Sequence, residues 1–203
     1  MGKNIGLIPL GFTEIWSASF NSAIIISAGD NAEFIAFCGI NLDITIFNKE
    51  NVYLPAFLKT YPFLNVEVEN KDKKINSLIA IDNNPKYVAK DKKIFILDKE
   101  KNLSKQVATK VELIKELNSQ RAVCRRIIAE LKKLDLLIKK DLRVKIEGKE
   151  EKVILEEFYV INIEKLLKLD DKIIASFAKK GWMGIFDAHL KSIGNFEKIL
   201  KAN

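Results

Sequence analysis

The hydrophobic pattern in the first half of the chain predicts short strands separated by turns. An apolar, β-branched run at 23–26 stops at the turn-forming residues 28–31. A second apolar run at 33–38 follows at hairpin distance, which predicts an antiparallel pair. Alternating or β-branched patterns predict further strands at 43–47, 64–68, 78–81 and 94–97.

Two short helices are predicted among these strands. Apolar and aromatic residues recur at helical spacing from Phe12 to Phe20, so we expect a helix there, with Ile15 and Trp16 on its apolar stripe. Pro55 is favourable at a helix start and predicts a helical turn over 56–61, which Pro62 ends.

The middle of the chain predicts one long amphipathic helix. From Ser104 to about Leu137 there is no glycine or proline, and apolar residues recur at steps of three, four or seven. Ser104 is expected to be the N-cap. Arg121 interrupts the apolar stripe and is expected to snorkel or to pair with a carboxylate, and a break is expected near Asp135.

The remainder predicts a β-hairpin followed by helices. Strands are expected at 142–146, 152–155 and 158–161, and helices at 163–169, 170–179 and 182–200, with Gly181 as a stop between the last two. The fold class is therefore α+β: an antiparallel β-rich N-terminal part, a long amphipathic central helix, a β-hairpin and C-terminal helices. We expect a single domain over 1–203, with any hinge near 86–105.

The charge of the chain is concentrated in its middle. The 203 residues include 34 basic and 27 acidic side chains, a net charge of +7, and residues 90–152 alone carry 19 basic and 11 acidic groups. Lysine outnumbers arginine 30 to 4, although arginine is the better ligand for phosphates and base edges. We interpret the surplus as a solvated helix face and expect no nucleic-acid partner.

The inventory of reactive residues excludes several kinds of site. Two cysteines, Cys38 and Cys124, and one histidine, His189, exclude a disulfide scaffold, a multi-thiolate zinc site and a two-histidine metal centre. No glycine-rich phosphate loop, dinucleotide fingerprint or serine elbow is present. We therefore expect no metal, no cofactor and no catalytic residue, and favour a protein that is not an enzyme without settling the question.

His189 allows two interpretations. It follows Phe186 by three residues and precedes Ile193 by four, so it points inward on the last predicted helix, with Ser192 on the same side. A neutral imidazole there would need a hydrogen-bond partner inside the core. Alternatively, His189, Ser192 and Asn195 line a polar pocket for a small ligand.

The N-terminus offers no targeting signal. Pro9 interrupts the first apolar run, and no window reaches the roughly 20 apolar residues of a membrane span. We expect a cytoplasmic protein with no membrane span, and leave open export without a cleaved signal.

Four sequence blocks remain to be considered: Val52–Phe63 (VYLPAFLKTYPF), Ile81–Pro85 (IDNNP), Phe158–Asn162 (FYVIN) and Ala188–Asn195 (AHLKSIGN). Together they resemble the bacterial SapC family, which is named for a surface-layer-associated protein. Their order and spacing agree with the family over roughly residues 7–200. The chain departs from it at Glu157, where many members have glycine, and at Lys59-Thr60, where members have two arginines.

The resemblance implies an accessory protein of S-layer or surface-glycan biology that binds a protein partner or a small carbohydrate-like ligand. It adds Tyr61 and Asp82 to His189, Ser192 and Asn195 as a hypothetical ligand wall. Two alternatives stay open: a small-metabolite enzyme or sensor with His189 as acid/base, and a cytosolic assembly factor that uses the long basic helix. The sequence leaves the oligomeric state undetermined.

Overall fold

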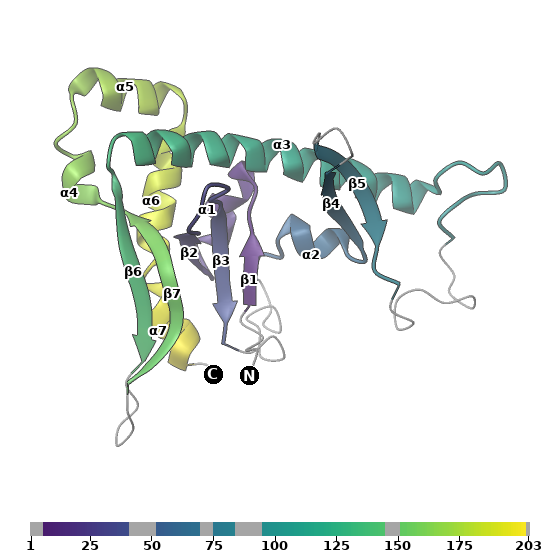
Figure 1. Ribbon diagram of the computed structural model, residues 1–203, viewed down its shortest axis with the longest axis horizontal. Helices are drawn as coiled ribbons and strands as arrows, with labels where there is room; N and C mark the ends of the chain where they lie inside the picture. The colour runs from purple at the N-terminus through teal and green to yellow at the C-terminus, as the bar shows by residue number, and fades with distance from the viewer. Residues whose placement is uncertain (1–5, 41–51, 70–74, 84–94, 145–150, 202–203) are drawn as a thin grey trace. The chain divides into compact units, whose positions relative to one another are not determined.

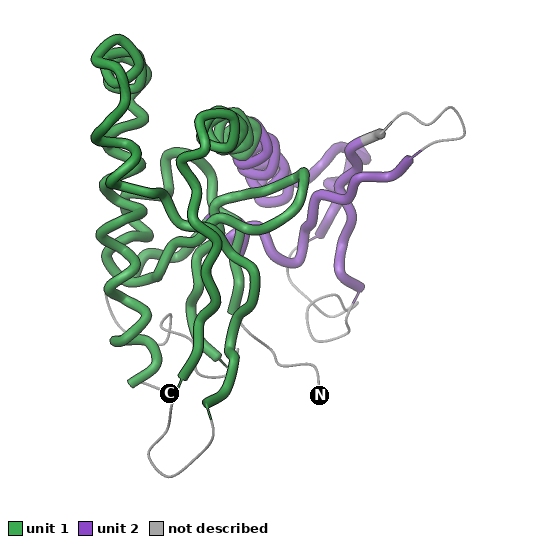
Figure 2. The backbone as a smooth tube through the Cα atoms, turned by 60° about the vertical axis from the view of Figure 1, so that its left-hand side comes forward, with its two compact units in different colours: residues 1–55, 120–203 green, residues 56–119 purple. Residues whose placement is uncertain are grey.

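The computed structural model describes residues 6–40, 52–69, 75–83, 95–144 and 151–201 (Figure 1). The predicted strand at 43–47 lies outside the described residues. The chain divides into two compact units, one formed by residues 1–55 and 120–203 and the other by residues 56–119 (Figure 2). The unit boundaries fall at 55/56 and 119/120, and the single domain with a hinge near 86–105 stays a prediction.

A five-stranded antiparallel sheet forms the centre of the first unit. In spatial order its strands are β1 (Gly6–Pro9), β3 (Phe34–Gly39), β2 (Ala23–Ile26), β7 (Lys152–Ile161) and β6 (Leu137–Val144). The hairpins β2–β3 and β6–β7 confirm the antiparallel pairs that the sequence predicts. The strands expected at 152–155 and 158–161 are one continuous strand, β7, and β6 begins earlier than predicted.

Short helices follow or connect these strands. They are η1 (Phe12–Glu14), α1 (Ile15–Ala18), α4 (Ile163–Leu166), α5 (Asp171–Lys179), α6 (Trp182–Ser192) and α7 (Asn195–Lys201). Helix α6 packs against β2 and β7, and α7 packs against β3. The fold class is α+β, as predicted.

The prediction of one helix over 182–200 was wrong. The helix stops at Ser192 and a new one begins at Asn195. The intervening Gly194 has a low helix propensity. The side chains of Ser192 and Asn195, on either side of it, both bond to backbone groups elsewhere in the unit, which favours a break there.

Aromatic side chains dominate the core of this unit. Phe34, Phe37, Phe177 and Phe186 are among its largest fully buried residues. Phe196 of α7 packs its ring 5.2 Å from that of Phe37, which fixes α7 against β3.

The second unit contains a two-stranded sheet and the start of the long helix. Its elements are α2 (Ala56–Thr60), β4 (Phe63–Glu69), β5 (Ile75–Ile81) and the first half of α3 (Lys105–Lys133). Phe63, Val107 and Ile114 form its buried core, with Ile81 and Val111 packed beside them.

At the entry into α3 one prediction was wrong and one was confirmed in position. Phe95–Leu97 is not a strand: among the described residues its ladder contact is an isolated bridge between Leu97 and Leu103. Ser104 is the N-cap residue, because it directly precedes the helix and its carbonyl accepts a hydrogen bond from the Ala108 N–H at 2.8 Å. Its Oγ makes no hydrogen bond with the described residues, so the side chain does not take part in the cap.

The second half of α3 is held in the first unit by an ion-pair cluster. Glu33 accepts two hydrogen bonds from Arg121, at 3.1 and 2.7 Å, and one from Arg125 at 2.7 Å. The prediction that Arg121 pairs with a carboxylate is confirmed. The helix ends at Lys133, and Asp135 adopts a positive φ of 54° before β6, so the expected break leads to a strand rather than a second helix.

Candidate functional site

His189 fills a gap in the sheet. Its side chain is fully buried, and its Nε2 accepts a hydrogen bond from the backbone N–H of Ile161 at 3.1 Å. Strands β2 and β7 are joined by one residue pair, Ile26 with Tyr159, so neighbouring backbone groups need other partners. The imidazole supplies one of them from α6.

The protonation state of His189 follows from this position. Burial lowers the pKa of the imidazole to about 4, and the backbone of Ile24 only partly opposes that effect. Because Nε2 is an acceptor, the neutral ring carries its proton on Nδ1. Such a ring supports the sheet and is poorly placed to exchange protons with a substrate.

Ser192 performs the same task on the other strand. Its Oγ accepts a hydrogen bond from the Ile24 N–H of β2 at 2.9 Å and donates one to the His189 carbonyl at 2.6 Å. Both side chains therefore satisfy backbone groups where β2 and β7 diverge.

Asn195 holds the turn that leads into β2. Its Nδ2 donates to the carbonyls of Ser19 at 2.8 Å and Ser22 at 3.0 Å, and it is nearly fully buried. The Ser19 Oγ donates to the Trp16 carbonyl at 2.7 Å, which helps to end α1. His189, Ser192 and Asn195 are all buried and each is bonded to the backbone, and a ligand-lining role for them stays a prediction.

An exposed aromatic pair lies next to the backbone segment that Asn195 holds. Trp16 and Phe20 leave 49% and 53% of their surfaces exposed, and their rings meet edge to face with centroids 6.1 Å apart. The Lys191 Nζ of α6 lies 4.8 Å from the centre of the Phe20 ring. We call Trp16, Phe20 and Lys191 the aromatic ledge.

The geometry of the aromatic ledge suits a ligand with flat apolar faces and negative charge. Phe20 lies between Ser19 and Ser22, the two residues whose carbonyls Asn195 holds, so its backbone is fixed from the core. Lys191 forms no ion pair with any described residue. Rigidly held exposed aromatic groups are typical of binding surfaces.

Sequence reasoning missed the aromatic ledge because it used these rings only as evidence for a short helix. The helical spacing is present, but the buried face of α1 is formed by Ile15 and Ala18, and Trp16 and Phe20 face solvent. The signal that could have found them is the polar cluster Ser17, Ser19, Asn21 and Ser22, which limits the helix to one turn.

Tyr61 and Asp82 form a separate pair in the second unit. The Tyr61 hydroxyl donates to the Asp82 carboxylate, and Lys110 of α3 donates to the Tyr61 carbonyl at 2.9 Å. The peptide bond between Tyr61 and Pro62 is cis. The structure therefore joins these two predicted residues to each other, and their role as a ligand wall stays a prediction.

The thiols are poorly suited to chemistry. Cys38 and Cys124 are fully buried, and burial raises the pKa of each to about 12. The thiolate form needed for nucleophilic attack is therefore scarce near neutral pH. Neither cysteine has an imidazole partner, since the sole histidine bonds to Ile161.

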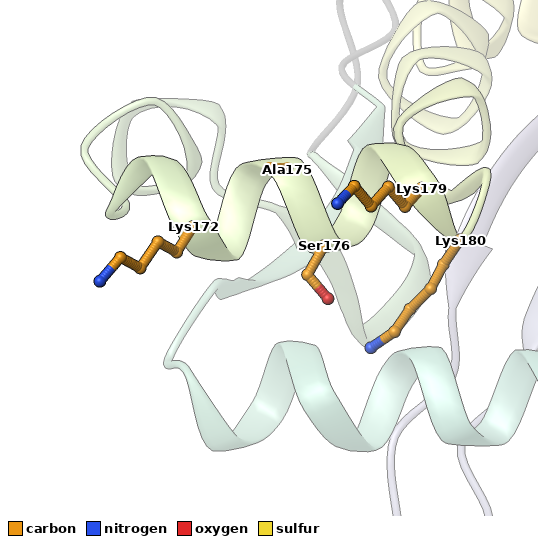
Figure 3. Close-up of a pocket in the computed structure, with 5 residues that line it drawn as sticks. All are labelled: Lys172, Ala175, Ser176, Lys179 and Lys180. Carbon is orange, nitrogen blue, oxygen red and sulfur yellow. The ribbon is translucent and has the colours of Figure 1, made fainter.

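A lysine-lined hollow lies at the other end of α6. It has a volume of about 520 Å³ and is lined by residues of α5 and the turn after it, namely Lys172, Ala175, Ser176, Lys179 and Lys180 (Figure 3). None of its lysines forms an ion pair within the described part of the chain, and the Lys180 Nζ lies 4.6 Å from the centre of the Trp182 ring. Lys180–Trp182 thus provides a second cation–aromatic pair with which the aromatic ledge can be compared.

The chain was compared with known protein families, curated proteins and solved structures. The SapC family model matches residues 1–199. The chain belongs to the SapC family. Comparisons with curated proteins and with solved structures give no match.

One backbone feature of this SapC-family chain lies at Glu157. This residue adopts a positive φ of 55° at an irregularity in the β6–β7 pairing. Its N–H bonds to the Asp141 carboxylate at 2.9 Å, which anchors the strained residue. Glu157 thus holds a backbone conformation that favours glycine.

Proposed function

We propose that this SapC-family protein acts by binding, as an accessory protein of S-layer or surface-glycan biology, and that the aromatic ledge receives its ligand. The observation that carries the proposal is the fixed, half-exposed pair Trp16–Phe20 with the unpaired cation of Lys191 beside it. Sugar rings present apolar faces that stack on aromatic side chains, and acidic sugars add a carboxylate for an ammonium group. The ligand class is therefore an acidic oligosaccharide.

The position of His189 supports binding over catalysis. A general acid or base must reach the substrate, and this imidazole is buried with Nε2 already bonded to Ile161. The alternative of a metabolite enzyme that uses His189 would require the sheet to open between β2 and β7.

The proposal also concerns where in the cell the protein binds its ligand. No helix among the described residues is long and apolar enough to cross a bilayer. We propose that the protein meets its ligand at or near the cell surface, which cell fractionation with an antibody tests.

The binding proposal is tested by calorimetric titration with an oligosialic acid and with neutral chitotetraose. We expect the acidic oligosaccharide to bind more tightly, Trp16→Ala and Phe20→Ala to lower its affinity at least tenfold, and Lys191→Ala to reduce the preference for the acidic ligand. Lys180→Ala is the matched control, because it removes the other cation–aromatic pair and should leave binding unchanged. Equal loss in Lys180→Ala and Lys191→Ala would contradict the proposed position of the site.

A further inference from the structure

Within the part of the chain that the structure describes, strand β5 is an edge of its two-stranded sheet. Among the strands that the structure describes, it is hydrogen-bonded only to β4, so its other side presents backbone N–H and C=O groups (Figure 1). Natural edge strands are usually guarded by charges, prolines or bulges. The sequence of β5, INSLIAI, contains no charge, no proline and no glycine.

One face of the β4–β5 pair is apolar and exposed. Val66 lies directly opposite Leu78, and Leu64 lies opposite Ala80, so these side chains share a face. Val66, Val68 and Leu78 leave 38%, 43% and 54% of their surfaces exposed. The opposite face carries Phe63, which is buried against α3.

The two edges of this small sheet differ in charge. Strand β4 carries the exposed carboxylates Glu67 and Glu69, so pairing β4 with a copy of itself would bring four negative charges to one seam. Pairing β5 with itself brings none. Charge therefore favours β5 as the edge that accepts another strand.

We propose that β5 pairs antiparallel with β5 of a second copy of this chain, joining two hairpins into one four-stranded sheet. One face of the hairpin already packs against α3, and pairing two copies would add backbone hydrogen bonds along β5 and apolar cross-strand contacts on the exposed face. Two-fold symmetry makes the contact self-complementary and closed. The partner that pairs with the β5 edge is therefore β5 of a second copy of the chain.

The register follows from full overlap of the seven residues. Ile75 lies opposite Ile81 of the partner copy, and Leu78 lies opposite the same leucine of the partner copy at the symmetry axis. This register keeps the exposed apolar faces of both hairpins on the same side. The seam is small, so we expect a micromolar dimer rather than a permanent one.

Sedimentation velocity over low-micromolar to hundreds-of-micromolar protein tests the dimer. We expect concentration-dependent dimerisation of the full chain, weakened at least tenfold by Leu78→Lys or Leu78→Glu, and restored when these two variants are mixed, because unlike charges then meet at the axis. Val66→Lys is the matched control on the same face of β4, the outer strand of the proposed sheet, and it should dimerise nearly as well. A monomer at all concentrations, or a dimer that Leu78→Lys leaves intact, would overturn the proposal.

A disulfide test reports the register and does not depend on the stability of the charged variants. In the proposed pairing the Cα atoms of residue 78 lie about 5 Å apart, within disulfide range, and those of residue 66 lie about 14 Å apart. We expect mild oxidation to cross-link Leu78→Cys and not Val66→Cys, with no background from the buried Cys38 and Cys124. Cross-linking of both variants alike, or of neither, would contradict the symmetric β5 seam.

Discussion

The ammonium group of Lys191 lies 4.8 Å from the centre of the Phe20 ring, joining the end of α6 to the turn before β2. The buried side chain of Asn195 donates hydrogen bonds to the carbonyls of Ser19 and Ser22, which lie on either side of Phe20 in the sequence. An exposed pair of aromatic rings is thus held in place by buried polar residues. This relationship is the basis for assigning ligand binding to the aromatic ledge.

Asn195→Ala should destabilise the protein by about 2 kcal/mol, because it leaves two buried carbonyls, those of Ser19 and Ser22, without their donor. Chemical denaturation monitored by circular dichroism measures the change in the free energy of unfolding. Lys198→Ala is the matched control: it removes an exposed partner of Asn195 and should cost about 0.5 kcal/mol or less. A similar loss of stability in both variants would contradict the idea that Asn195 holds the carbonyls of Ser19 and Ser22.

His189 should make the fold sensitive to acid. Its pKa is about 4 in the folded protein and about 6.5 when unfolded, so the unfolded chain binds the proton more readily between these values. Stability is therefore fully present above pH 6.5 and declines as the pH falls toward 4, by up to about 3 kcal/mol from this residue.

The pH test compares the wild type with His189→Gln, whose amide oxygen can still accept from the Ile161 N–H. Denaturant midpoints are measured from pH 7 to pH 4. We expect the variant to lose less stability over this range than the wild type. Parallel curves for the two proteins would show that the imidazole is not buried in its neutral form.

Glu157→Gly should be more stable than Glu157→Ala by about 1 kcal/mol, because only glycine adopts a φ of 55° without a steric cost. Both variants lose the exposed ion pair with Lys139, so the difference between their stabilities reports the cost of the backbone conformation alone. Thermal unfolding of the two variants measures this difference. Glu156→Gly, at a neighbouring strand position with ordinary φ, should instead destabilise; a lower stability of Glu157→Gly than of Glu157→Ala would be inconsistent with the strained backbone.

The elements that the sequence predicted well are those that local pattern determines. The β2–β3 hairpin follows from two apolar runs and a turn containing Gly29, whose φ is 90°. Helix α3 follows from a long periodic stripe without glycine or proline, and the inward position of His189 follows from the stripe of α6. Local periodicity predicts these elements correctly because each one packs against the rest of the protein with the same face along its whole length.

The features that the sequence could not predict depend on contacts between distant residues. Asn195 and Ser19 are 176 positions apart, so no local pattern indicated that this side chain would fix the turn carrying Phe20. The same holds for the bond between His189 and Ile161, and for the break between α6 and α7. Helical spacing predicted a short helix from Phe12 to Phe20 but could not show that Trp16 and Phe20 face solvent, since the buried residues of α1 are Ile15 and Ala18.

Tryptophan fluorescence of the Trp182→Phe variant tests the central claim most directly. This variant keeps Trp16 as its only tryptophan, so a ligand on the aromatic ledge must change the emission of that one residue. Titration with an oligosialic acid should give a saturable change in emission that Lys191→Ala weakens at least tenfold and Lys180→Ala does not. Calorimetric binding of the same oligosaccharide with no change in Trp16 emission, or an absence of binding to the wild type, would contradict the account.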